Sequence, residues 1–282
     1  MHTTLISATA LKNFKGELRI FDCSADLAKP HAGMEQFLEK HIADALFADI
    51  NTDLSTHDST LAVNAGRHPL PSCEHFARWL GEHGVSNGTQ VVVYDRQGMN
   101  YCGRLWWMLK WCGHEAVAVL DGGLQAWETV GGGLQTGHAA IPSTASFAVR
   151  EPLVVLKHTA EVAKALGQAA QTIVDARAPA RYKGETEPFD PVAGHIPGAL
   201  NRPFNSNIGS DGLMKPAQVL RAEFETLLAG HAANSVVHHC GSGISAIPNV
   251  IAMEVAGLGR TALYAGSWSE WCNTPGLPCA QS

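Results

Sequence analysis

Two features that would indicate a membrane or secreted protein are missing from this 282-residue chain. No apolar run approaches the roughly 20 residues that a helix needs to cross a bilayer. The first residues lack the basic segment followed by a long apolar one that defines a signal peptide. We therefore expect a cytoplasmic protein that has no membrane partner.

A concentration of positive charge is missing as well. The formal net charge is -6, and the basic residues are scattered along the chain. A protein that binds nucleic acid normally carries a basic patch or stripe. We therefore expect no nucleic-acid partner, and we expect any anionic substrate to be attracted by a local cation.

Paired cysteine motifs are also missing. The chain has seven cysteines at irregular spacing and contains no Cys-x-x-Cys pair. An odd number of cysteines in a chain of this length argues against a disulfide framework. Without a Cys-x-x-Cys pair, a zinc site of that type has no support either, and we expect no metal site.

What the chain does contain is an internal repeat. Four pairs of positions recur at nearly constant separation: Asp22 and Asp175 by 153, Asp95 and Cys240 by 145, Gly122 and Gly266 by 144, and Trp127 and Trp271 by 144. A series of nearly equal offsets indicates a duplicated domain. We predict domains at residues 1–140 and 153–282, joined by a linker at residues 141–152.

Each half alternates short apolar runs with amphipathic stretches. Residues 91–94 and 236–239 are typical of buried parallel strands, while residues 104–111 and 246–256 are typical of helices. Alternation of strands and helices predicts an α/β fold, with a mainly parallel sheet flanked by helices in each domain.

Cys240 lies where a predicted strand ends and a glycine-rich turn leads into a helix. Ligands of parallel α/β sheets bind beyond the carboxyl ends of the strands. The backbone N–H groups of a tight turn can form an anion-binding nest, and the helix N-terminus adds positive potential. Both effects favour a thiolate, which is the nucleophilic form of cysteine.

Cys240 has alternative interpretations. A buried cysteine before an ordinary glycine-rich turn fits the same residues, but the repeat favours one reactive site paired with a silent position at Asp95. A cysteine phosphatase of the Cys-x5-Arg type needs an arginine six residues after the cysteine, where this chain has Ala246. The residues around Cys240 also differ from those around the catalytic cysteine of a papain-like protease.

The stretch Cys240-Gly241-Ser242-Gly243-Ile244-Ser245-Ala246 resembles the active-site loop of two-domain rhodanese-family sulfurtransferases. It is similar to the form found in 3-mercaptopyruvate sulfurtransferases, whereas thiosulfate-specialised rhodaneses typically carry Cys-Arg-Lys-Gly-Val-Thr. Further matches lie at residues 106–109, 120–123, 174–177, 181–184, 194–199 and 266–271. The resemblance spans nearly the whole chain and implies two tandem rhodanese-like domains, of which the first is inactive.

The resemblance implies that Cys240 carries the transferred sulfur. In the family, the cysteine takes a sulfane sulfur from a donor and becomes a persulfide, which a thiophilic acceptor then discharges. The backbone of the following loop, with Gly241, Gly243, Ile244 and Ser245, would bind the donor and the terminal sulfur. This double displacement predicts ping-pong kinetics. A bound cofactor is not expected, because the chemistry resides in one sulfur atom.

The resemblance also implies a proton relay through Ser242 and His68. The alternatives are a small residue that fits the loop at Ser242 and a packed interface histidine at His68. Relatives place a carboxylate in the relay, but Asn51 stands at the matching position here. This departure weakens the relay hypothesis.

Arg181 matches the arginine that contacts the anionic donor in the family, although an interdomain salt bridge is the alternative. Mercaptopyruvate enzymes usually carry a second arginine shortly downstream, where this chain reads Glu187-Pro188-Phe189-Asp190-Pro191. We predict transfer from 3-mercaptopyruvate to a thiol, cyanide or thioredoxin-like acceptor. The alternatives are a thiosulfate:cyanide sulfurtransferase, or a sulfur-relay or binding module with weak turnover.

Other polar and aromatic residues near these motifs are expected to be structural. Asp175 and His195 recur in the first half, so we interpret them as scaffold. His238 and His239 alternate on a strand and should face opposite sides of the sheet, in packing roles. Trp268 fits either the wall of the active-site mouth or the core.

Overall fold

The computed structural model describes residues 1–282, which form two compact units. The first unit comprises Met1–Leu61, Pro71–Leu153 and Ser210–Leu213, and the second comprises Ala62–Leu70, Val154–Gly209 and Met214–Ser282. The segment Ala62–Leu70 therefore packs with the C-terminal half of the chain. Residues 141–152 fall within the first unit, where the Ala145 N–H donates to the Gly81 carbonyl at 2.8 Å.

The first unit is built on a parallel five-stranded sheet with the strand order β1-β6-β5-β2-β4. In that order the strands are Leu5–Ile6, Val117–Leu120, Gln90–Tyr94, Leu18–Asp22 and Leu46–Phe47. A separate antiparallel pair joins β3 (His41–Ile42) and β7 (Leu134–Gln135). The helices of this unit are α1 (Ala8–Lys12), α2 (Ala32–Glu39), α3 (Cys73–Glu82), α4 (Cys102–Trp111) and α5 (Gly123–Thr129).

The second unit also has a parallel five-stranded sheet, with the order β8-β12-β11-β9-β10. In that order the strands are Val155–Lys157, Ala262–Tyr264, Val236–His239, Thr172–Asp175 and Leu200–Asn201. Its helices are α6 (Thr159–Lys164), α7 (Pro179–Lys183), α8 (Ala217–Leu228), α9 (Ile247–Val255) and α10 (Ser267–Trp271), with short 3-10 turns η1 (Phe204–Asn207) and η2 (Ala233–Ser235).

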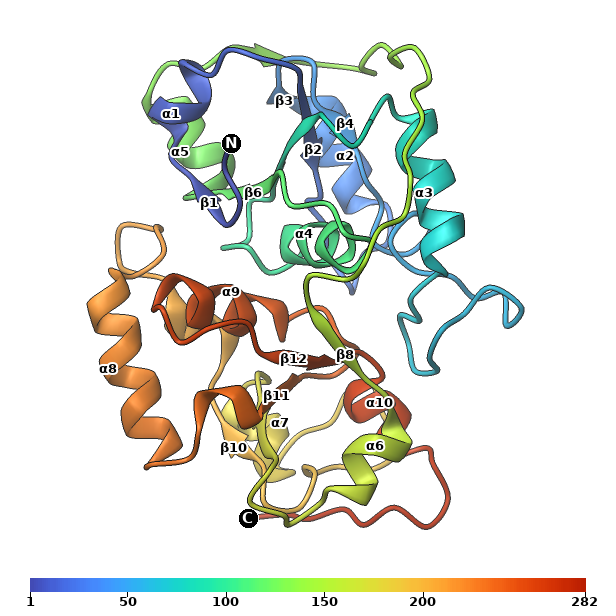
Figure 1. Ribbon diagram of the computed structural model, residues 1–282, viewed down its shortest axis with the longest axis vertical. Helices are drawn as coiled ribbons and strands as arrows, with labels where there is room; N and C mark the ends of the chain where they lie inside the picture. The colour runs from blue at the N-terminus through green and yellow to red at the C-terminus, as the bar shows by residue number, and fades with distance from the viewer. The chain divides into compact units, whose positions relative to one another are not determined.

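The two sheets have the same topology when they are compared strand by strand. Each places the fourth of its five strands in sequence at the centre, β5 in the first unit and β11 in the second. Figure 1 shows helices packed around each sheet, with α8 and α9 side by side in the second unit. The predicted α/β fold, with two parallel sheets flanked by helices, is confirmed.

The helix that follows each central strand is buried, for reasons visible in its composition. All four strand residues of β11 are buried, and α9 after it is apolar over most of its length. In the first unit, Trp106 and Trp107 of α4 are fully buried, and α4 packs against β5 and β6. The strands predicted at residues 91–94 and 236–239 and the helices predicted at 104–111 and 246–256 are confirmed, each within two residues at either end. No helix of the chain combines the length and apolar character of a membrane span.

Candidate active site

Cys240 immediately follows β11, the central strand of the second sheet. It lies at the carboxyl end of the strand and is buried, with 2% of its surface exposed. Its N–H donates to Ser267 Oγ at 3.1 Å, and its carbonyl accepts from the Trp268 N–H at 3.0 Å. The start of α10 therefore holds the Cys240 backbone in place from a neighbouring strand end.

The loop after Cys240 has the tight curvature that its glycines predict. Gly243 has a φ of +75°, in the left-handed region that favours glycine. A Cβ at this position would lie 2.3 Å from the Ala265 carbonyl oxygen, so no larger residue fits without movement. The loop backbone can therefore curl closely around the cysteine.

Several backbone donors of this loop are left open. The N–H groups of Gly241, Ser242, Ile244 and Ser245 donate no hydrogen bond within the protein. Buried N–H groups are almost always paired, so a series of unpaired ones marks a place for an acceptor. The loop is followed by α9, whose N-terminus adds positive potential. Such a concave row of donors binds an anion.

Asp95 occupies the matching position in the first unit, directly after the central strand β5. Its carboxylate accepts hydrogen bonds of 2.8–3.0 Å from four backbone N–H groups of the following loop and helix start: Gln97, Met99, Tyr101 and Cys102. In each unit the helix begins seven residues after this position, at Cys102 and at Ile247. The first loop is thus filled by its own anion, whereas the second has none.

His68 and Ser242 lie in contact, although 174 positions separate them in the sequence. The distance from His68 Nδ1 to Ser242 Oγ is 2.8 Å, and both side chains are buried. The Ala62–Leu70 segment is held to α10, because the Arg67 N–H donates to Ser269 Oγ at 3.1 Å. The structure thus brings these two predicted site residues together.

Arg181 lies on α7 and is held by acidic groups from the segment after it. Its Nη2 donates to Glu187 Oε1 at 2.7 Å and lies 3.6 Å from Asp190 Oδ2. The Nη1 of Arg181 lies 3.3 Å from the point where a Cβ of Gly241 would be. These ion pairs of Arg181 lie within the second unit and are not the interdomain salt bridge considered as the alternative, and the guanidinium reaches the cysteine loop.

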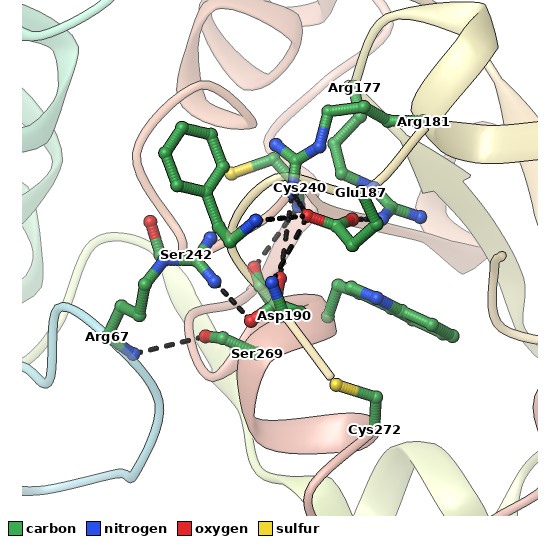
Figure 2. A network of polar contacts seen from close by, with 12 residues as sticks. Arg67, Arg177, Arg181, Glu187, Asp190, Cys240, Ser242, Ser269 and Cys272 are labelled. Atoms are coloured by element: carbon green, nitrogen blue, oxygen red, sulfur yellow. Dashed lines mark hydrogen bonds and ion pairs between the residues drawn. The ribbon is translucent and has the colours of Figure 1, made fainter. Parts of the chain in front are cut away.

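Arg67 is a neighbour of the loop that no motif in the sequence indicates. Its Nη1 is paired with Asp190 Oδ1, and its Nη2 lies 2.8 Å from the same Cβ point at Gly241 (Figure 2). The only signal in the sequence was its position directly before His68. Nothing in a linear pattern indicates that this segment folds onto the second unit.

Asp175 and Arg177 form a buried ion pair beside the strand that carries Cys240. Arg177 Nη2 donates to Asp175 Oδ2 at 2.6 Å, and His239 Nε2 lies 3.6 Å from the same oxygen. Burial alone would raise the pKa of Asp175, but His239 and the Arg177 guanidinium lower it below its ordinary value. Burial opposes the charge on Arg177 too, yet Asp175 and Glu187 raise the pKa of Arg177. Arg177 therefore remains a fixed cation.

The two strand histidines face opposite sides of the sheet, as predicted. His238 lies against Met253, with Nε2 3.2 Å from the sulfur, whereas His239 lies beside Asp175. Burial lowers the pKa of both, and that of His238 to about 3. Trp268 is fully buried in the core, where the Arg177 guanidinium stands 4.9 Å from the centre of its ring. It is therefore a core residue.

Asn51, the position at which the relay hypothesis expects a carboxylate, lies in the first unit. Its N–H donates to Asp49 Oδ1 at 2.7 Å, and Asp53 Oδ2 accepts from the Asp49 N–H at 2.8 Å. These side chains therefore hold a local turn. His195, predicted to be scaffold, stacks on Tyr182 with ring centres 4.0 Å apart.

The fold and the site together define a class of protein: a duplicated parallel α/β protein whose second half presents a buried cysteine in an open anion-binding loop. Residues 7–129 and 158–274 both match the Rhodanese-like domain. The chain belongs to the rhodanese family.

Its relatives carry sulfurtransferase names. The chain is 40% identical over 265 residues to a probable 3-mercaptopyruvate sulfurtransferase of Pseudomonas aeruginosa, covering 94% of this chain and 92% of the relative. It is 34% identical over 260 residues to a thiosulfate sulfurtransferase of Cricetulus griseus, covering 90% and 84%. The structure of 3-mercaptopyruvate sulfurtransferase from Leishmania major matches with a TM-score of 0.84 and 28% identity, covering 98% of this chain and 76% of that one. The predicted family and the predicted class of enzyme, a sulfurtransferase, are confirmed.

Proposed function

We propose that this sulfurtransferase takes sulfur from 3-mercaptopyruvate onto Cys240 and passes it to a thiophilic acceptor. The observation that supports this most is the contrast between the two loops. In the first unit the loop donors bind the Asp95 carboxylate, so a loop of this length is suited to an anion. In the second unit the residue is a cysteine, which is too short to fill its own loop, and the donors remain open for a persulfide anion.

The chemical steps balance without a bound cofactor. The Cys240 thiolate attacks the sulfur of 3-mercaptopyruvate, forming an S–S bond as the C–S bond breaks. The electron pair of the broken bond passes to the carbon, giving the enolate of pyruvate, which then takes up a proton. A thiolate acceptor next attacks the outer sulfur of the persulfide, and Cys240 leaves as a thiolate. The backbone donors stabilise the negative outer sulfur between the two steps.

Ser242 and His68 are proposed to move the proton of the donor thiol. The 2.8 Å contact between Ser242 Oγ and His68 Nδ1 supports this role, because a relay requires hydrogen-bond reach between its members. Ser242 lies two residues after Cys240, the sulfur carrier. In this scheme the relay takes the proton from the thiol of the donor and returns it to the enolate carbon of the product. The pyruvate then leaves in its keto form, in which the carboxylate is the only charged group.

Arg181 is proposed to bind the donor carboxylate, with Gly241, Gly243, Ile244 and Ser245 supplying backbone contacts. A guanidinium binds a carboxylate with charge-assisted hydrogen bonds, and the Nη1 of Arg181 reaches Gly241. The names of the relatives from Pseudomonas aeruginosa and Leishmania major favour 3-mercaptopyruvate. The Cricetulus griseus relative and the absence of an arginine at residues 185–191 favour thiosulfate as the second candidate donor.

The acceptor is proposed to be a small thiol, cyanide or a thioredoxin-like protein, since each can attack the outer sulfur. The N-terminal half is proposed to be catalytically silent, because Asp95 offers no sulfur and fills its own loop. Neither nucleic acid nor membrane has a part in the reaction.

A comparison of the wild-type chain with Cys240→Ala tests the proposal. Wild type, incubated with 3-mercaptopyruvate and no acceptor, should gain the mass of one sulfur atom at Cys240 and release pyruvate. Cys240→Ala should do neither, and Cys279→Ala, which removes an exposed cysteine, should behave as wild type. Sulfur transfer that survives in Cys240→Ala would contradict the mechanism. A kcat/KM for thiosulfate well above that for 3-mercaptopyruvate would contradict the choice of donor.

A further inference from the structure

Two arginines from distant segments meet beside the cysteine loop. Arg67 comes from the Ala62–Leu70 segment and Arg181 from α7. Their guanidinium carbons stand 5.3 Å and 5.1 Å from the centre of the Phe189 ring. Arg67 Nη2 and Arg181 Nη1 both approach Gly241, the residue after Cys240, and neither donates a hydrogen bond within the protein. Two cationic groups with open donors therefore converge beside the cysteine loop.

Asp190 lies between these arginines and is poorly satisfied (Figure 2). Its Oδ1 pairs with Arg67, but its buried Oδ2 accepts no hydrogen bond and lies 3.6 Å from Arg181 Nη2. A buried carboxylate oxygen without a hydrogen bond is costly. Glu187 differs, because its Oε1 accepts from Arg181 and from two backbone N–H groups. Asp190 is thus the weakly held anion of the cluster.

We propose that Asp190 determines donor affinity by competing with the carboxylate of the donor for Arg67 and Arg181. In the empty enzyme the Asp190 side chain partly neutralises both guanidinium groups. A donor carboxylate that binds the open Nη atoms is repelled by the Asp190 carboxylate. The two guanidinium groups attract the donor fully only when the Asp190 side chain turns away from them. Arg67 thereby becomes a second donor-binding residue. This inference rests on the proposed function, because it assigns the site that would bind the donor.

Asp190→Asn and Arg67→Gln should therefore change donor binding in opposite directions. Asn keeps the shape of the side chain but removes the charge, so KM for 3-mercaptopyruvate should fall several-fold with little change in kcat. Arg67→Gln removes a cation and should raise KM several-fold. Mercaptoacetone, in which a methyl group replaces the carboxylate, should show neither effect. Glu185→Gln is the matched control, because it makes the same charge change at an exposed position nearby.

Alkylation of Cys240 tests the anion site without any sulfur donor. The ratio of the rates with anionic iodoacetate and neutral iodoacetamide, followed at the Cys240 peptide by mass spectrometry, reports the local attraction for an anion. The ratio should rise several-fold in Asp190→Asn, fall several-fold in Arg67→Gln, and stay constant in Glu185→Gln. An unchanged or lower ratio in Asp190→Asn would overturn the inference and leave Asp190 as a residue that positions the arginines. If the alkylation ratios change as expected but the enzyme does not turn over 3-mercaptopyruvate, only the proposed donor is overturned.

Two cysteines of the first unit lie in contact. Cys73, the first residue of α3, and Cys112, directly after α4, have sulfur atoms 2.7 Å apart, although 39 positions separate them in sequence. Cys73 is partly exposed and Cys112 is buried. Few adjustments of the side chains are needed to bring two thiols at this separation to bonding distance.

We infer that Cys73 and Cys112 form a disulfide by exchange with a low-molecular-weight disulfide. The accessible Cys73 thiolate attacks one sulfur of the reagent and releases one thiol. The Cys112 thiol then attacks the Cys73 sulfur and passes its proton to the departing thiolate, which leaves as the second thiol, so that one disulfide is reduced as another forms.

Treatment of the intact chain with oxidised glutathione tests this pairing. The expected product is a cross-linked peptide pair containing Cys73 and Cys112, without bound glutathione, that is absent in Cys73→Ser and in Cys112→Ser. The oxidised wild type should also melt several degrees higher, and a reductant should reverse the shift. A stable glutathione adduct on Cys73, or reaction confined to the exposed Cys279, would overturn the inference.

Discussion

Asp95 and Cys240 occupy the same position in the two sheets, directly after the central strand, but only Asp95 fills the loop that follows it. Four backbone N–H groups donate to the Asp95 carboxylate, whereas the corresponding loop of Cys240 keeps its donors open. The duplication thus supplies an internal comparison. One loop uses its anion site for stability, and the other leaves the site to a ligand.

Asp95→Ala should destabilise the first unit and leave sulfur transfer intact. The substitution leaves four N–H groups without their acceptor, at a cost of about 3 kcal/mol. Thermal unfolding, compared with that of Asp58→Ala at an exposed turn, measures the loss. If kcat falls in a sample that is still folded, Asp95 has a part in the reaction that the present scheme does not assign.

Gly243→Ala should impair both the stability and the activity of the second unit. The φ of +75° strains any other residue, and the added Cβ would meet the Ala265 carbonyl oxygen at 2.3 Å. The loop must shift, and a displaced reacting group reduces kcat on the order of 10²-fold. Gly259→Ala is the matched control, since Gly259 has a φ of +89° but open space around it. Equal effects of the two substitutions would show that the contact with Ala265 is unimportant.

Ser242→Ala and His68→Gln should each lower kcat with 3-mercaptopyruvate by about 10²-fold, because each interrupts the same proton relay. The double variant should be no slower than the slower single variant, since residues that act as a unit are not additive. Thiosulfate has no thiol proton to transfer and should be affected far less. Equal losses with both donors would instead indicate a packing role for the pair.

His238→Leu should make the stability of the chain less sensitive to acid. Burial lowers the pKa of His238 to about 3, from an ordinary value of 6.5, so between these values only the unfolded chain is protonated there. The free energy of unfolding therefore decreases as the pH falls below 6.5, by roughly 1.4 kcal/mol for each pH unit.

Urea unfolding of the wild type and His238→Leu near pH 7 and about pH 5 measures the difference, which should be about 2 kcal/mol. His239, whose pKa burial also lowers, is present in both proteins and cancels. Identical pH dependence of the two proteins would contradict a neutral, buried His238.

Local patterns in the sequence were sufficient for the duplicated fold and for the position of Cys240. The buried strands and helices around Cys240 follow from apolar runs and their periodicity, and the glycine loop from its composition. Gly243 illustrates why: its left-handed backbone, with a φ of +75°, is a conformation that glycine adopts without strain, so the residue type alone indicates the turn. Such short-range constraints are legible in a linear sequence.

The surroundings of Cys240 were decided by tertiary structure. The sequence by itself suggested His68 and Arg181 through resemblance, but not Arg67 or the role of Asp190. Those side chains meet because the Ala62–Leu70 segment packs with the second unit, over a separation of 123 positions between Arg67 and Asp190. An ion pair of that range depends on how the chain folds back on itself, and charge patterning along the sequence carries no record of it.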